Sequence, residues 1–140
     1  MQIIQADKTN KKAIKRFYKN NHYSASFMGD DACYFITEDS ADNTNIIAGV
    51  IISYQQSTPF LHALVVTKEY RGKGLSTLLL NHCQQQINLI YCFANNSLCR
   101  LYQQQGFASI AANQLPESLK VRLLNYQQKS PSLQSLIWQR

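Results

Sequence analysis

The chain has 140 residues, of which 45% are hydrophobic, and a formal net charge of +6. A chain of this length forms one domain whose core needs no metal or disulfide, so we expect a single domain over residues 1–140. No apolar run is long enough to cross a bilayer, and residues 1–6 lack the basic and apolar regions of a secretory signal. These features predict a cytoplasmic protein without membrane contact.

The four cysteines predict neither a metal site nor a disulfide framework. They are Cys33, Cys83, Cys92 and Cys99. None of them forms a Cys-x-x-Cys pair or has a histidine at the spacing of a zinc site. We therefore expect reduced, mostly buried thiols and no bound metal.

The pattern of apolar residues predicts an α+β domain with a mixed sheet. Strands are predicted at residues 1–6, 33–38, 46–54, 60–66, 89–93, 107–111 and 133–138, with a polar turn at residues 39–45. Helices are predicted at residues 8–20, 74–86, 97–105 and 116–126. Asp7 or Thr9 suits the N-cap of the first helix. The apolar face of the second helix is expected to hold Leu75, Leu78, Leu79 and either His82 or Cys83. The strand–helix–strand crossover over residues 60–93 predicts that its two strands pair in parallel.

Six basic residues gather on the first predicted helix. They are Lys8, Lys11, Lys12, Lys15, Arg16 and Lys19. Such a face attracts polyanions, but the aromatic residues that a single-strand binder needs are not interleaved with these lysines. We interpret the face as solvated and rank nucleic-acid binding last among the candidate functions.

A glycine-containing turn joins the strand at residues 60–66 to the helix that follows. Gly72 and Gly74 allow a tight turn with inward-pointing N–H groups, and the positive end of the helix adds to the same concavity. The turn is therefore predicted to bind phosphate. It is not a Walker A loop, because Thr67 stands at the first glycine position, and it is not a dinucleotide fingerprint, because Thr77 stands at the third.

This turn resembles the pyrophosphate loop of the GNAT superfamily of N-acetyltransferases. The loop of that superfamily reads Arg/Gln-x-x-Gly-x-Gly/Ala after a strand that ends in valine, and here Arg71, Gly74 and Ser76 follow Val66. Ser76 departs from the usual Gly or Ala but is small enough to keep the turn. The resemblance implies a GNAT-like mixed sheet of about six to seven strands with a splayed central parallel pair, flanked by about four helices.

A second motif downstream supports the same resemblance. Asn95, Tyr102 and the pair Gly106-Phe107 fit the Asn-x6-Tyr-x3-Gly-Phe signature of the superfamily, although Leu98 replaces a common alanine. Two motifs in the right order are more specific than either one alone. The resemblance therefore implies one acyl-CoA N-acyltransferase domain, with acetyl-CoA as its cofactor.

The resemblance also assigns residues to the cofactor. These are Leu64, Val65, Val66, Arg71, Gly72, Lys73, Gly74, Leu75, Ser76, Thr77 and Asn95. The backbone of the strand is expected to pair with the pantetheine arm, and the amides of the turn are expected to hold the pyrophosphate. Asn95 is expected to contact the cofactor arm, although an asparagine between a strand and a helix also suits a turn.

Two side chains are candidates for proton transfer. Tyr102 matches the usual general acid of the superfamily, which protonates the departing thiolate, although a packing role is the alternative. Many relatives have an acidic base five positions before the asparagine, where this chain has Ile90. His62 is then the best candidate for the base, since its strand is similar to that of the arylalkylamine N-acetyltransferases, with Phe60 in place of the first of their two histidines. A satisfied core histidine is the alternative for His62.

The function implied is transfer of the acetyl group of acetyl-CoA to a primary amine, directly within a ternary complex. The alternative is an acyl-CoA-binding sensor or regulatory module without turnover, which the missing acid favours. The acceptor is expected to be a small-molecule amine or a peptide amine, attracted by Asp30, Asp31 and Glu38 unless these are simply solvated. The protein is expected to be a monomer or a homodimer, because the strand at residues 133–138 suits either the end of one sheet or a pairing across a dimer axis.

Overall fold

The computed structural model describes residues 2–38 and 45–140, so the predicted turn at residues 39–45 lies outside the described residues except for Asn45. Within the described residues, seven strands form a mixed sheet in the order β1-β2-β3-β4-β5-β7-β6. The strands are β1 Ile3–Gln5, β2 Ala32–Thr37, β3 Ile46–Gln55, β4 Thr58–Val66, β5 Leu89–Ala94, β6 Ala108–Ser109 and β7 Gln134–Gln139. The α-helices are α1 Lys11–Asn20, α2 Leu75–Gln86, α3 Asn96–Gln104 and α4 Glu117–Gln127, and the 3-10 helices are η1 Lys8–Asn10, η2 Lys68–Tyr70 and η3 Ala112–Gln114. The mixed sheet, its parallel pair and its four α-helices confirm the predicted fold class.

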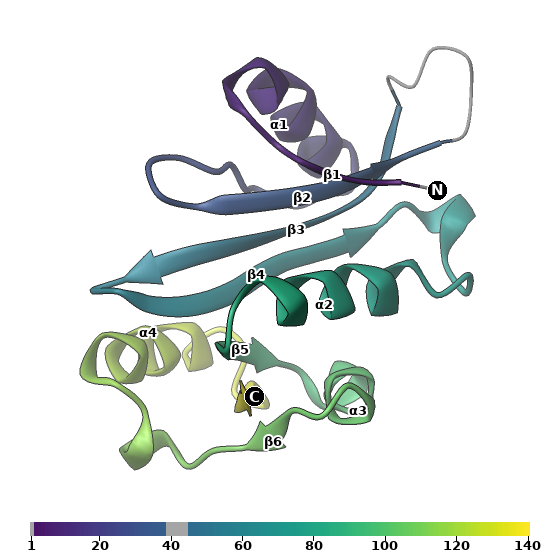
Figure 1. Cartoon of the computed structure of the whole chain (residues 1–140). Coiled ribbons are helices and arrows are strands. Elements are labelled where there is room, and N and C mark those ends of the chain that lie inside the picture. Colours follow the sequence, from purple (N-terminus) through teal and green to yellow (C-terminus); the bar gives the residue numbers. More distant parts are fainter. Residues whose placement is uncertain (1, 39–44) are drawn as a thin grey trace. The chain divides into compact units, whose positions relative to one another are not determined.

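The chain packs into two compact units. The first takes in the described residues of Met1–Ser53 together with His62–Leu80. In this unit α1 lies over the antiparallel strands β1 and β2 (Figure 1). Apolar side chains of α1 pack there against β2, β3 and β4; the core includes Ile14, Phe17, Tyr18, Cys33, Phe35, Ile51 and Ala63. Asp7 is the N-cap of the 3-10 helix η1 that leads into α1, and its carboxylate accepts the Thr9 N–H at 2.8 Å. The N-cap residue of α1 itself is Asn10, which makes no side-chain cap bond.

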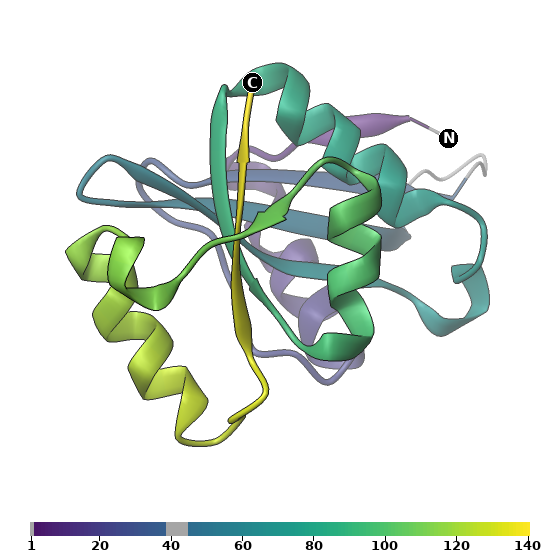
Figure 2. The same cartoon turned by 90° about the horizontal axis from the view of Figure 1, so that it is seen from below.

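The second unit takes in Tyr54–Leu61 and Asn81–Arg140. Phe60 and Leu61 at the start of β4 pair in parallel with Tyr91 and Cys92 of β5, as the crossover predicted. Strand β7 is antiparallel to both β5 and β6 and lies between them (Figure 2). Strand β7 is therefore paired along its whole length with β5 and at Leu136 and Ile137 with β6.

The apolar face predicted for α2 is partly wrong. Leu75, Leu79 and Cys83 are buried as predicted, but Leu78 is 44% exposed and Leu80 is buried in its place. Successive helical residues are separated by about 100°, so the four buried positions fall on one broad arc and Leu78 lies outside it. The buried face of α2 is therefore centred on a different side of the helix from the predicted face, which leaves Leu78 exposed.

Candidate active site

The turn between β4 and α2 has the conformation that its glycines predict. Gly72 and Gly74 have φ angles of 78° and 79°, in the left-handed region that glycine adopts without a steric penalty. The carbonyl of Gly74 accepts the N–H of Leu78 at 3.1 Å, so α2 begins directly after this glycine. The first N–H groups of a helix have no acceptor within the helix and are available to an anion.

Two cations lie at this turn. The Nε of Arg71 donates a hydrogen bond of 3.0 Å to the carbonyl of Val66, which ties the turn to the end of β4. The Nζ of Lys73 lies 5.3 Å from the centre of the Tyr70 ring. Tyr70 in turn donates its hydroxyl to a carboxylate oxygen of Glu38 at 2.9 Å. The residues flanking the turn are therefore held by neighbours within the first unit.

His62 has a partner that the sequence reasoning missed. Its Nε2 lies 2.7 Å from the hydroxyl oxygen of Ser53, a buried residue of β3. Strands β3 and β4 are joined by Gln56 and Ser57, which both have positive φ angles, as in a two-residue I′ hairpin turn. A tight hairpin brings side chains that share one face of its two strands close together, which is how Ser53 reaches His62.

The residue after His62 has an unusual backbone. Ala63 has a φ angle of 57°, which costs an alanine about 1–2 kcal/mol. Its carbonyl accepts the hydroxyl of the fully buried Tyr18 at 2.8 Å. A left-handed residue inside a strand interrupts the regular ladder and re-aims neighbouring side chains. Such residues cluster at functional sites, where the surrounding structure holds them in place.

Tyr102 lies in the second unit, in α3. It is 5% exposed, and its ring centre is 5.4 Å from that of Phe107 in an edge-to-face arrangement. Gly106 ends the helix with a φ angle of 90°. Phe107 of the motif thus packs against the tyrosine, which is the arrangement expected if Tyr102 has a packing role. Asn95 is the N-cap residue of α3, and its carbonyl accepts the N–H groups of Leu98 and Cys99 at 2.9 and 3.1 Å.

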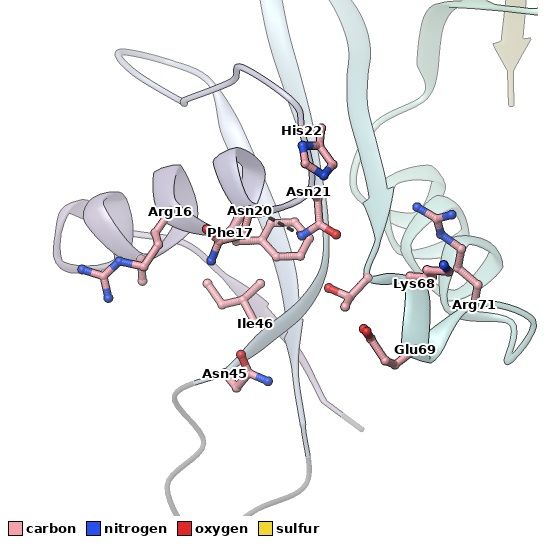
Figure 3. Close-up of a pocket in the computed structure, with 12 residues that line it drawn as sticks. Arg16, Phe17, Asn20, Asn21, His22, Asn45, Ile46, Lys68, Glu69 and Arg71 are labelled. Atoms are coloured by element: carbon pink, nitrogen blue, oxygen red, sulfur yellow. Dashed lines mark hydrogen bonds between the residues drawn. The ribbon is translucent and has the colours of Figure 1, made fainter.

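A polar pocket of about 610 Å³ lies in the first unit. Side chains from the end of α1 face those of the segment that leads into the glycine turn (Figure 3). Its lining includes Asn20, Asn21, His22, Thr67, Lys68 and Glu69. Asp30, Asp31 and Glu38, which were expected to attract an amine, are not among the described residues that line it. Bonds from Asn45 and then Tyr70 lower the pKa of Glu38, so this carboxylate is engaged within the fold.

The cysteines do not form a nucleophilic or metal-binding site. All four are free and buried. Burial, and secondarily Cys99, raises the pKa of Cys92 well above its usual range, which disfavours the thiolate. Within residues 2–38 and 45–140, no group of three or more metal-ligating side chains comes together. No helix in that part of the chain is long and apolar enough to span a bilayer.

Comparisons with known proteins agree with this geometry. The chain matches the family described as Acetyltransferase (GNAT) domain over residues 5–127. Comparison with curated proteins finds no match. Among solved structures, the chain is similar to a GNAT-family acetyltransferase from Staphylococcus aureus, with 17% identity and a TM-score of 0.67, over 99% of this chain and 98% of the other.

Two further structures were crystallised with the coenzyme. N-acetylglutamate synthase from Neisseria gonorrhoeae, complexed with coenzyme A and N-acetyl-glutamate, is 15% identical with a TM-score of 0.70. The match covers 99% of this chain and 34% of the synthase, so the chain spans about a third of that protein's length. Rv2747 from Mycobacterium tuberculosis, in complex with CoA, is 8% identical with a TM-score of 0.71, over 100% and 99% of the two chains. With the family match extending over most of the chain and both motifs in place, the protein belongs to the GNAT acetyltransferase family.

Proposed function

We propose that the protein transfers the acetyl group of acetyl-CoA to a primary amine by direct attack within a ternary complex. Family membership supports acyl transfer in general. The observation that carries the finer proposal is the pair of left-handed glycines, Gly72 and Gly74, at the start of α2. Consecutive backbone amides in a turn of this kind form a concavity that binds anions, and a pyrophosphate would bind there.

The turn suits the coenzyme in shape and charge. Ideal Cβ atoms built on Gly72 and Gly74 meet nothing within 4 Å, so the space beside the turn is open to a ligand. Arg71 and Lys73 are exposed there and supply positive charge. The residues that would hold the coenzyme are Leu64, Val65, Val66, Arg71, Gly72, Lys73, Gly74, Leu75, Ser76, Thr77 and Asn95. The coenzyme, when bound, supplies an acetyl thioester.

Tyr102 and His62 are the residues we propose for proton transfer. The Tyr102 hydroxyl would give its proton to the leaving sulfur, and His62 would take one from the ammonium of the acceptor, directly or through water. The position of Tyr102 in the second motif supports its role. The left-handed Ala63 beside His62 supports the role of this histidine, because strained backbone is typical of functional sites.

Direct transfer is favoured over a covalent acyl-enzyme. An acyl-enzyme needs an activated nucleophile, and cysteine is active as the thiolate. Burial raises the pKa of Cys33 to about 12 and that of Cys92 further. With these thiols neutral at working pH, attack by an amine held beside the thioester is the simpler route.

The acceptor belongs to this proposal as a small-molecule or peptide amine. The polar pocket of about 610 Å³ is within the size range of sites for small ligands. Its mixture of amide, cationic and carboxylate side chains suits a polar acceptor better than an apolar one. We propose a cytoplasmic setting and a monomer or homodimer, the former supported by four free cysteines.

Calorimetry and a thiol-release assay test the proposal together. We expect the purified protein to bind CoA and to release free thiol from acetyl-CoA when an amine from a chemically varied panel is added. Absence of both CoA binding and thiol release would overturn the proposal.

The second candidate is an acyl-CoA sensor without turnover. It is favoured by Ile90, a fully buried residue of β5 at the position where many relatives carry an acid. Tight CoA binding with no transfer to any amine, together with indifference to Tyr102→Phe, would establish the sensor and exclude the enzyme.

A further inference from the structure

We propose that Ser53 is a positioning residue that holds His62 in the ring tautomer needed for accepting a proton. The inference rests on the proposed function as far as turnover is concerned. The tautomer itself can be measured without turnover, so the two ideas can fail separately.

The geometry of the pair is that of a fixed hydrogen bond. The Oγ of Ser53 and the Nε2 of His62 are 2.7 Å apart, and Ser53 is only 8% exposed. Both residues stand on strands, where the backbone leaves little freedom for the side chains to drift apart. The bond from Tyr18 to the carbonyl of Ala63 fixes the backbone on the other side of His62. Two hydrogen bonds therefore fix the position of His62: one from its ring to Ser53, and one from Tyr18 to the backbone of the next residue.

The proposed role requires one direction for this bond. A neutral ring carries one N–H, and when Nε2–H donates to the Ser53 oxygen the lone pair lies on Nδ1. Nδ1 then takes the proton released by the acceptor ammonium, and the resulting imidazolium still donates Nε2–H to Ser53. In the opposite tautomer the Ser53 hydroxyl donates to Nε2 and engages the lone pair of the ring. Proton uptake at Nε2 would then require this hydroxyl to turn away and become the acceptor. Ser53 itself neither gains nor loses a proton in the step.

The chain offers a matched control for a buried strand serine. Ser135 of β7 is also buried, and its hydroxyl donates to the carbonyl of Ile110 at 2.7 Å. Ser135→Ala removes the same groups from a similar environment in the second unit. A purely structural contribution of a buried hydroxyl should therefore appear equally in Ser53→Ala and Ser135→Ala.

Nitrogen NMR of ¹⁵N-histidine-labelled protein gives the direct test, with His62→Gln used to assign the signals. We expect the neutral His62 ring to be protonated at Nε2 in the wild type and in Ser53→Thr, and to become a mixture of tautomers in Ser53→Ala. Ser135→Ala should leave the tautomer unchanged. A wild-type ring protonated at Nδ1 would overturn the proposal even if Ser53→Ala failed to fold.

Kinetics give the second test. We expect Ser53→Ala to lower kcat about tenfold with little change in the KM for acetyl-CoA, and Ser53→Thr to restore it. Equal losses of kcat in Ser53→Ala and Ser135→Ala would overturn the positioning role. If the wild type binds CoA but transfers nothing, the proposed enzymatic function fails while the NMR result still decides the tautomer.

Discussion

The hydroxyl of Tyr18 donates a hydrogen bond of 2.8 Å to the carbonyl of Ala63, so a residue of α1 holds the one left-handed residue described within β4. The space beside this hydroxyl is tight at Gly49, where an added Cβ would lie 3.0 Å from it. Because Ala63 follows His62 directly, α1 helps to set the backbone that carries the candidate base. This relationship makes Tyr18 a residue whose loss should be measurable.

Tyr18→Phe should lower the free energy of unfolding by about 1–3 kcal/mol, because it leaves the buried carbonyl of Ala63 without this donor. Chemical denaturation followed by far-UV circular dichroism measures the change. Tyr54→Phe is the control, because Tyr54 is 37% exposed and its substitution should change stability by less than about 0.5 kcal/mol. Equal effects of the two substitutions would contradict the stabilising role of the Tyr18 bond.

The conformation of the glycine turn should determine the affinity for the coenzyme. Gly72→Ala and Gly74→Ala should each raise the Kd for CoA roughly 5- to 30-fold, because a left-handed alanine costs about 1–2 kcal/mol and relaxes the free turn away from the binding conformation. Calorimetric titration with CoA measures this change.

Gly29→Ala is a matched control for the turn. Gly29 also has a positive φ angle, 58°, and open space at its Cβ position, but it lies in the loop after α1. The Gly29→Ala variant should lose about as much stability as the two turn variants and keep the wild-type affinity for CoA. If all three variants bind CoA like the wild type, the turn is not the pyrophosphate site.

The conformation of the glycine turn and the parallel crossover could be predicted because their signals are local. Two glycines in three positions between a strand and a helix leave few structural alternatives, and an intervening helix requires parallel pairing. The parallel register of Phe60 with Tyr91 then follows from the sheet. The predicted coenzyme residues and the roles of Tyr102 and His62 remain predictions.

Ser53 and Ala63 could not be predicted from the sequence, for different physical reasons. The hairpin that brings Ser53 to His62 turns at Gln56 and Ser57, which lack the Asn-Gly or Gly signal of such turns. Alanine seldom adopts a positive φ angle, so nothing in the residue itself marks Ala63. Its conformation depends on the bond from Tyr18, which is distant in the sequence.

Alkaline pH should destabilise the protein partly through Cys33. Burial, and secondarily Asp31, raises the pKa of this thiol from 9.0 to about 12 in the folded state. Above about pH 9 the unfolded chain loses this proton while the folded chain keeps it, so the free energy of unfolding falls as pH rises toward 12. Below pH 9 the thiol is protonated in both states and does not change the free energy of unfolding. Between pH 9 and 12 this free energy falls by up to about 1.4 kcal/mol per pH unit because of Cys33.

Urea denaturation at about pH 8 and about pH 10.5 measures this dependence. Other groups titrate in the same range, so the informative quantity is the difference in slope between the wild type and Cys33→Ala. The variant should lose less stability over this interval, whatever its stability at the lower pH. Parallel slopes for the two proteins would contradict the predicted contribution of Cys33.

Tyr102→Phe separates the two readings of the second motif. The phenylalanine ring keeps the edge-to-face packing on Phe107 and removes the hydroxyl alone. If Tyr102 protonates the leaving thiolate, kcat should fall by roughly 10²- to 10⁴-fold while the Kd for CoA and the melting temperature stay close to the wild-type values. If the tyrosine only packs α3, kcat should change by less than about twofold. Steady-state assays paired with calorimetry on the same preparation distinguish these outcomes, since a loss of CoA binding in parallel with kcat would instead indicate damage to the fold.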